Sequence, residues 1–240
     1  MTKIAVILAA GSGRRFGADT PKQFLKVAGV PILELTLRAF ESAPDIDRIC
    51  VVAHPDHFAD VNLICEKAGI SKFRAVIPGG EERRDSAIAA IRHLSSLPDD
   101  SIILFHDAAR PLVSQRIIRD CVEALSHYDA AAAGIPSSDT LWEVDENRLI
   151  ARIPQRSRFF RAQTPQAFRL GTIRNAYLRA ASDPGFVPTD DCGVLKRYDP
   201  DTNIAVIDGD PANIKVTFPD DIAFVESFLN SKKSIDSSNP

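Results

Sequence analysis

Short apolar runs alternate with amphipathic segments over much of this 240-residue chain, and that alternation restricts its fold more than any other feature. Apolar runs that predict buried strands cover 4–8, 49–53, 73–77, 102–105 and 130–135. Helix patterns lie between them at 32–40, 60–68, 86–94 and 117–125. Such alternation predicts an α/β domain with a mostly parallel central sheet flanked by helices, which binds its ligands at the carboxyl ends of the strands.

The alternation breaks after Pro136. Two runs at 140–144 and 149–153 flank a polar turn, which predicts a β-hairpin inserted between elements of the main sheet. An isolated hairpin is marginal in water, and this one carries the apolar residues Trp142 and Ile150. We therefore expect residues 137–158 to form a protruding arm that is covered by a second copy of the chain in a homodimer. The alternative is an antiparallel edge folded back on its own domain.

The remaining segments complete one domain over residues 1–230. Helix patterns at 170–181 and 191–197 precede a strand at 204–207, a short strand or turn at 214–217, and a last helix at 220–229. No repeat or interdomain linker is visible. Residues 231–240 are polar, and we expect them to form a flexible tail.

Composition narrows the class of protein. The chain is 45% hydrophobic and 25% charged, which suits a globular domain. A net charge of −3 provides no basic field for nucleic acid, and no apolar stretch reaches the ~20 residues that span a bilayer. The amino terminus lacks a signal-peptide pattern, and the four cysteines are scattered without a Cys-x-x-Cys pair. We expect a cytoplasmic protein with reduced cysteines, no membrane partner and no nucleic-acid partner.

A small-residue loop follows the first strand and carries the strongest functional signal. Ala9, Ala10, Gly11 and Gly13 let backbone N–H groups approach an anion closely. Two arginines, Arg14 and Arg15, and then Lys22 supply fixed cations. The combination predicts a triphosphate site, and a plain turn with solvated arginines is the alternative.

Two familiar glycine motifs do not fit this loop. A Walker A loop requires Gly-Lys-Ser/Thr at its end, whereas Phe16 and Gly17 follow the arginines here. A dinucleotide fingerprint requires an acidic residue after the second strand, but that strand is followed by His54 and Pro55. P-loop NTPases and nicotinamide dehydrogenases are therefore excluded.

Two further clusters follow expected strands. Gly79 and Gly80 are followed by acidic residues and Ser86. These residues either bind a base or ribose at the start of a helix or form an ordinary helix start. The block from His106 to Pro111 directly follows the 102–105 strand. In it the Asp107 carboxylate can bind Mg²⁺ or a hydroxyl, and Arg110 can pair with a phosphate. A local Asp–Arg pair that only shapes the loop is the alternative. We expect His106 to be a structural hydrogen-bonding residue.

The last cluster contains Lys215 between Ile214 and Val216. A partly shielded cation requires an anion nearby, so Lys215 could form a three-cation clamp on a reacting phosphate with Arg15 and Lys22. The alternative is a surface lysine whose stem alone is buried. Together the clusters favour phosphoryl or nucleotidyl transfer, which depends on alignment and charge neutralisation, and no Gly-x-Ser-x-Gly nucleophile motif appears.

At these residues the chain resembles a known enzyme family. The matching blocks span nearly the whole chain and include 9–15, 21–23, 79–80, 83, 85–86, 106–111, 139–140, 163–166, 189–191 and 213–217. The sequence is similar to the 2-C-methyl-D-erythritol 4-phosphate cytidylyltransferases of the non-mevalonate isoprenoid pathway. Trp142, and Cys192 after the 189–191 block, also resemble the sister family, the ribitol 5-phosphate cytidylyltransferases.

The resemblance implies a Rossmann-like nucleotidyltransferase fold and a role for each matched residue. It implies CTP binding by Ala9, Ala10, Gly11, Gly13, Gly80, Ser86 and Asp107, catalysis by Arg15, Lys22 and Lys215, and acceptor binding by Arg110, Thr140, Arg156 and Thr164. Arg156 would come from the neighbouring subunit, and Asp107 would also contact Mg²⁺ or another divalent cation. A UTP- or GTP-dependent sugar transferase and an inactive nucleotide-binding regulator are the alternatives.

Overall fold

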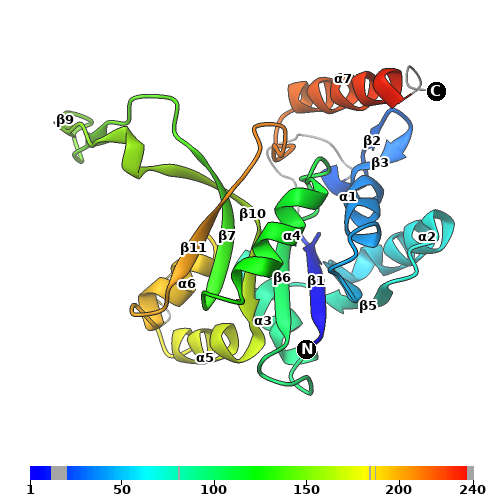
Figure 1. The fold of residues 1–240 in the computed structure, drawn as a ribbon, viewed down its shortest axis with the longest axis horizontal. Coiled ribbons are helices and arrows are strands. Elements are labelled where there is room, and N and C mark those ends of the chain that lie inside the picture. Colours follow the sequence, from blue (N-terminus) through cyan, green and yellow to red (C-terminus); the bar gives the residue numbers. More distant parts are fainter. Residues whose placement is uncertain (12–20, 81, 184, 187, 237–240) are drawn as a thin grey trace.

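A seven-stranded sheet runs through the middle of the computed structural model (Figure 1), which describes residues 1–11, 21–80, 82–183, 185–186 and 188–236. The strand order is β11-β7-β10-β6-β1-β4-β5. The strands are β1 (Lys3–Leu8), β4 (Arg48–Ala53), β5 (Phe73–Pro78), β6 (Ile102–Asp107), β7 (Ala130–Pro136), β10 (Phe160–Arg169) and β11 (Ile204–Asp208). β10 pairs antiparallel with β6 and β7, and the other pairings are parallel. The predicted mostly parallel α/β sheet is confirmed.

Helices cover both faces of this sheet. One apolar core gathers side chains from α1 (Ile32–Glu41), α2 (Phe58–Ala68) and α4 (Gln115–Ala124), and the other from α3 (Arg83–His93), α5 (Leu170–Ala180) and α6 (Asp191–Tyr198). Along β1, Ala5 and Ile7 enter the first core while Ile4 and Val6 enter the second. Because both faces are buried, the central strands are continuous apolar runs, which is why the sequence predicts them.

The sequence pattern does not predict β10, although this strand lies near the centre of the sheet. It includes Arg161, Gln163, Gln166 and Arg169, so it has neither an apolar run nor a clean alternation. Its register shifts between Ala162 and Gln166, and the residues between them bulge beside the carboxyl end of β6. The bulge therefore places Gln163 at the edge of the sheet where ligands are expected, whereas Arg169 lies at the other end of β10 beside Ile102.

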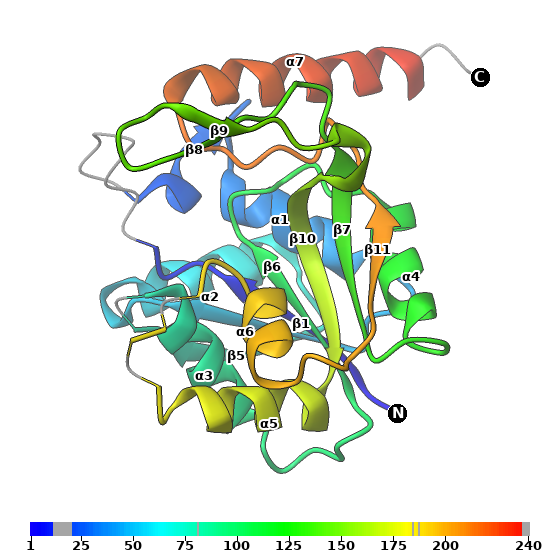
Figure 2. The same ribbon diagram turned by 90° about the vertical axis from the view of Figure 1, so that its left-hand side faces the viewer.

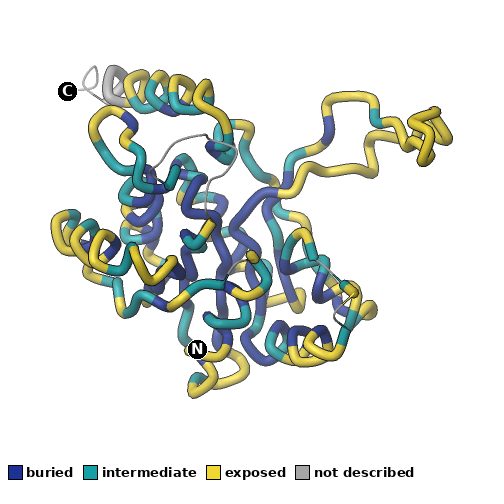
Figure 3. The backbone as a smooth tube through the Cα atoms, turned by 180° about the vertical axis from the view of Figure 1, so that it is seen from behind, coloured by how far each residue is buried: buried dark blue, intermediate teal, exposed yellow. Residues whose placement is uncertain are grey.

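The hairpin after β7 projects away from the domain (Figures 1 and 3). Its strands β8 (Glu143–Val144) and β9 (Ile150–Arg152) form a separate two-stranded sheet, and the short helix η4 (Arg156–Arg158) follows. Trp142 is 63% exposed and Ile150 is 51% exposed. The predicted arm is confirmed as a protrusion, whereas the alternative that it folds back on its own domain is wrong.

A last helix, α7 (Pro219–Asp236), lies across one end of the molecule (Figures 1 and 2) and continues into the segment for which a flexible tail is expected. Near it lie η2 (Lys22–Phe24), β2 (Lys26–Val27) and β3 (Val30–Pro31), while η3 (Pro55–His57) precedes α2. Residues 214–217 form no strand, but the N–H of Val216 donates to the carbonyl of Ala109 at 2.8 Å. Among the described helices, none is both long and apolar enough to cross a membrane.

Candidate active site

Several of the predicted site residues lie where the parallel strands end. Ala9 follows β1, Asp107 ends β6, and Gly79 and Gly80 link β5 to α3. The carboxyl ends of parallel strands meet at one edge of a sheet, and the register pairs Leu8 of β1 with Asp107 of β6. Gly13 and Arg15 lie outside the described residues, so their predicted roles stay predictions.

Tight packing brings the nucleotide-binding candidates together. A Cβ added at Gly79 would collide with the Cβ of Ala10 and would lie 3.1 Å from the Oγ of Ser86. A larger residue at position 79 would therefore push the turn before α3 away from the first loop. Gln23, which is 4% exposed, donates to the carbonyl of Ala9 at 2.6 Å. Sequence reasoning assigned no role to Gln23, which ties η2 back to the end of β1.

The Asp107 carboxylate is the centre of a charged cluster and is 8% exposed. Its Oδ2 atom lies 3.0 Å from Nζ of Lys215 and 3.3 Å from Nε of Arg110, and its Oδ1 atom lies 3.9 Å from Nε of Arg83. Burial alone would raise the pKa of Asp107, but Lys215, Arg83 and Arg110 together hold that pKa well below its usual value. Asp191 also contacts Arg83, so among the described residues three cations face two carboxylates, and the positive charge left over suits a phosphate.

A buried chain of hydrogen bonds fixes the backbone at Asp107. The Asp107 N–H donates to Oγ1 of Thr164 at 3.1 Å, and this hydroxyl lies 3.0 Å from Nδ1 of His106. Nε2 of His106 lies 3.1 Å from the carbonyl oxygen of Arg110, so Nε2 carries the proton and Nδ1 accepts from Thr164. Burial lowers the pKa of His106 to about 4, which keeps the ring neutral. The structural role predicted for His106 is confirmed, and Thr164 shares it.

Helix α7 connects the two lysine-bearing segments. Val225 of α7 packs in a small apolar cluster with Val27, which follows the Lys22 segment, and with Val216, which follows Lys215. Asp221 of α7 accepts the N–H of Thr217 at 2.7 Å. The helix therefore sets the distance between two parts of the site that are far apart in the sequence.

We expect Val225→Ala to lower kcat about tenfold, because the cavity would let the two lysine-bearing segments shift relative to each other. Val61→Ala is the matched control, since Val61 and Val225 are both 0% exposed but Val61 lies on α2 in the first sheet core. Both variants should lose about 2 kcal/mol of unfolding free energy in urea titrations. Equal kcat values in the two variants would contradict a positioning role for α7.

Two predicted acceptor residues, Thr140 and Arg156, lie on the arm rather than at the sheet edge. Both are exposed, and Nη1 of Arg156 donates to the carbonyl of Ser138 at 3.0 Å. Within one chain the structure does not gather them with Asp107, because the arm extends away from the domain (Figure 1). Their assignment to an acceptor pocket depends on a second subunit and stays a prediction.

Sequence reasoning gave Arg83 no role, although this arginine belongs to the charged cluster. It is the first residue of α3, where the helix dipole disfavours a cation. An arginine at that position needs carboxylate partners. Its place at the start of a helix is therefore the sequence feature that could have predicted its ion pairs. Its partners are Asp107 and Asp191, and the sequence separates both of them from Arg83 by a strand or more.

The side chains around Asp107 decide whether the predicted magnesium site fits Mg²⁺. Among the described residues, no group of three or more His, Cys, Asp or Glu side chains is placed to hold a metal ion. Asp107 supplies a single charged carboxylate beside cations that suit phosphates. Since protein-bound Mg²⁺ commonly takes one carboxylate together with substrate phosphates and waters, this donor set fits Mg²⁺ that enters with a nucleotide.

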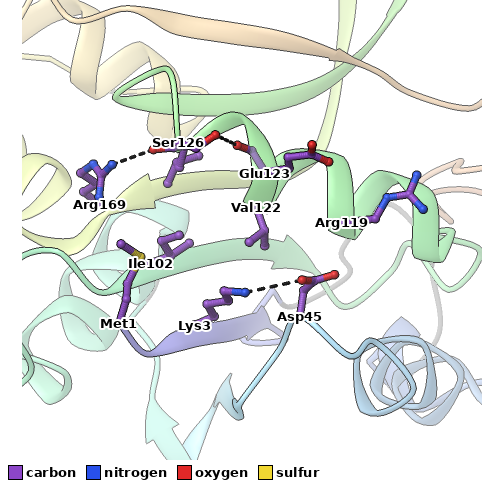
Figure 4. Close-up of a pocket in the computed structure, with 10 residues that line it drawn as sticks. Met1, Lys3, Asp45, Ile102, Arg119, Val122, Glu123, Ser126 and Arg169 are labelled. Atoms are coloured by element: carbon purple, nitrogen blue, oxygen red, sulfur yellow. Dashed lines mark hydrogen bonds and ion pairs between the residues drawn. The ribbon is translucent and has the colours of Figure 1, made fainter.

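A hollow of about 430 Å³ opens at the opposite edge of the sheet, where β1 and β6 begin (Figure 4). Two of its cations have partners of their own: Nζ of Lys3 lies 3.5 Å from Asp45, and Arg169 donates to the carbonyl of Leu125 at 2.6 Å. These contacts favour a structural role for both cations, so the Asp107 edge remains the candidate active site.

Comparison with known proteins decides the family. The family model described as 2-C-methyl-D-erythritol 4-phosphate cytidylyltransferase matches residues 3–231. The chain belongs to this family. A Thermobifida fusca protein of the same name is 42% identical over 231 residues, which cover 95% of this chain and 93% of that protein. The resemblance predicted from the sequence blocks is confirmed.

Two further proteins are similar to this chain. The bifunctional ribulose 5-phosphate reductase/CDP-ribitol pyrophosphorylase of Haemophilus influenzae is 36% identical over 230 residues, and the match covers 95% of this chain but 48% of that protein. The crystal structure of 4-diphosphocytidyl-2C-methyl-D-erythritol synthase from Anaerococcus prevotii superimposes with a TM-score of 0.83 at 28% identity, over 95% of this chain and 96% of that one. The nucleotidyltransferase fold predicted for this chain is confirmed.

Proposed function

We propose that this chain transfers a cytidylyl group from CTP to 2-C-methyl-D-erythritol 4-phosphate and releases pyrophosphate. The observation that carries the proposal is the buried Asp107 carboxylate with Arg83, Arg110 and Lys215 around it at the ligand edge of the sheet. The family model supports this reaction, and so does 42% identity to the Thermobifida fusca protein over 231 residues.

The reaction needs alignment and charge more than a nucleophilic side chain. An oxygen of the acceptor phosphate attacks the α-phosphorus of CTP, while the bond from that phosphorus to the β-phosphate oxygen breaks. Pyrophosphate leaves with the electron pair, and the attacking oxygen is already anionic, so no base is required. We assign Lys22 and Lys215, with Arg15, to the reacting phosphate, where they offset the charge that develops in the transition state.

Asp107 and Lys215 change partners in this scheme. Before CTP binds, they form an ion pair of 3.0 Å. The α-phosphate competes for Lys215, and Asp107 stays charged because Arg83 and Arg110 remain beside it. Asp107 is the residue that would hold Mg²⁺, which when bound neutralises part of the triphosphate charge.

The remaining roles follow from position. Backbone groups at Ala9, Ala10, Gly11 and Gly80, with the Ser86 hydroxyl, would hold the nucleotide, and we assign Gly13 to the same set. Arg110 and Thr164 would lie on the acceptor side. Thr140 and Arg156 would reach that acceptor from the arm of a partner chain, which makes the proposed enzyme a homodimer.

The proposal is tested by measuring pyrophosphate release with Mg²⁺, methylerythritol phosphate and each nucleoside triphosphate in turn. We expect CTP to exceed UTP and GTP by about 100-fold in kcat/KM, and we expect no release when the acceptor is omitted. Preference for UTP or GTP would contradict the proposal. CTP binding in calorimetry without turnover would favour an inactive regulator instead.

We also propose a reducing, cytoplasmic compartment, supported by the free cysteines Cys50, Cys65, Cys121 and Cys192. Burial raises the pKa of Cys65 and of Cys121 to about 12. Both therefore stay protonated at pH 9, and we expect iodoacetamide to leave them unmodified in the native protein. Mass spectrometry should find both alkylated in urea, and rapid native alkylation would contradict their burial.

A further inference from the structure

Two carboxylates share the guanidinium of Arg83. Its Nη2 atom lies 2.6 Å from Oδ2 of Asp191, while its Nε atom lies 3.9 Å from Oδ1 of Asp107. Arg83 begins α3, Asp191 begins α6, and Asp107 ends β6. The guanidinium therefore joins three elements at the candidate active site, and its stronger contact is with the carboxylate farther from Lys215.

Buried groups other than Arg83 also hold Asp191 in place. It is 0% exposed, and its Oδ1 atom accepts a hydrogen bond of 2.6 Å from the hydroxyl of Tyr177 on α5. Burial raises the pKa of Tyr177 well above its usual value, so the hydroxyl acts as a donor at every pH the enzyme meets. The Asp191 N–H also donates to Oε1 of Gln166 at 3.2 Å.

Fold stability does not explain the ion pair of Arg83 and Asp191 well. A buried ion pair contributes little net stability compared with apolar residues, because both charges must lose their hydration. Arg83 keeps a 24% exposed side chain and turns Nε toward Asp107, which contacts Lys215. The arrangement therefore has its clearest consequence at the candidate active site.

Without Asp191, Asp107 would be the remaining ion-pair partner of the guanidinium among the described residues. Arginine and carboxylate close readily into a two-bonded fork, and such a fork would occupy both oxygens of Asp107. The carboxylate would then exchange partners less readily when phosphate arrives. Asp191 prevents that closure by holding Arg83 at 3.9 Å from Asp107.

We propose that Asp191 and Tyr177 are positioning residues, which hold the Arg83 guanidinium beside Asp107 without letting it close on that carboxylate. This inference rests on the proposed cytidylyl transfer for its kinetic consequences. Its structural consequence is independent of turnover.

Tyr177→Phe removes the supporting hydroxyl with little change of shape, and we expect kcat to fall about tenfold with the KM for CTP within about twofold. Tyr198→Phe is the matched control, because that hydroxyl also donates to an aspartate, Asp183, at 2.9 Å, and lies away from Asp107. Tyr198→Phe should keep the parental kcat. Equal kcat values for the two variants would overturn the proposal.

A paired substitution separates positioning from folding. Arg83→Gln alone leaves the Asp191 charge buried without its partner and should lower the melting temperature strongly. Arg83→Gln combined with Asp191→Asn removes both charges, so the melting temperature should recover while kcat stays about 100-fold below the parent. Recovery of kcat together with stability would show a purely structural pair and would overturn the proposal.

A crystal structure of Asp191→Asn provides a readout that needs no activity. We expect the Arg83 guanidinium to have moved into hydrogen-bond distance of both Asp107 oxygens. An Arg83 that stays in place would overturn the proposal even if the parent turned over CTP. Conversely, a parent without CTP turnover would contradict the proposed function, and this structure would still decide the positioning role.

Discussion

Replacing Lys215 by alanine should lower kcat for pyrophosphate release by about 100-fold or more, with little change in the melting temperature. Nζ of Lys215 lies 3.0 Å from the Asp107 carboxylate, and we assign Lys215 to the phosphate that carries the developing charge. Asp107 keeps Arg83 and Arg110 when Lys215 is lost, so folding should be nearly unaffected. Lys22→Ala should behave in the same way.

Lys3→Ala is a suitable control for this loss. Lys3 also pairs with an aspartate, Asp45 at 3.5 Å, but at the opposite edge of the sheet. Its removal should leave kcat unchanged. Parental turnover in both Lys22→Ala and Lys215→Ala would contradict the clamp that these residues are proposed to form.

The second large effect concerns the arm. The parent should sediment as a dimer at micromolar concentration, and Trp142→Asp with Ile150→Asp should convert it to a monomer. Trp142 is 63% exposed and Ile150 is 51% exposed on a hairpin that the described part of its own domain leaves uncovered. Aspartates there would put charge into an apolar contact. The monomer should lose at least about tenfold in kcat/KM for the acceptor, because Arg156 would no longer reach it.

An exposed leucine elsewhere tests whether any surface charge has the same effect. Leu178 on α5 is 66% exposed, and Leu178→Asp should remain dimeric and active. A parent that sediments as a monomer would contradict the proposed role of the arm in dimerisation. A double arm variant that remains dimeric would contradict it as well.

The helices and strands that sequence patterns predicted are those whose surroundings stay the same along the whole element. β1 is apolar after Lys3 and β6 is apolar as far as Phe105, because both faces of these strands are buried. Helix α2 is capped by Gly69, whose φ of 64° suits a glycine. β10 escaped prediction because its environment changes along its length: Gln163 and Gln166 bind neighbouring loops while Ala167 and Phe168 enter the cores. No single period describes such a strand.

The site was partly predictable for a similar reason. Asp107, Arg110 and Lys215 were chosen because each stands directly after or inside an apolar segment, and the structure brings all three together. The local pair of Asp107 and Arg110 that was the alternative is present at 3.3 Å, while the binding roles of both residues stay predictions. Asp191 and Tyr177 act through Arg83 across the fold, and no local pattern in the sequence indicates such a contact.

The acceptor of this enzyme is decided by comparing two polyol phosphates in one assay. The measurement is kcat/KM for 2-C-methyl-D-erythritol 4-phosphate and for ribitol 5-phosphate, at fixed CTP and Mg²⁺, with each CDP product identified by mass spectrometry. We expect the value for methylerythritol phosphate to exceed that for ribitol phosphate by about 100-fold or more. An equal or higher value for ribitol phosphate would contradict it.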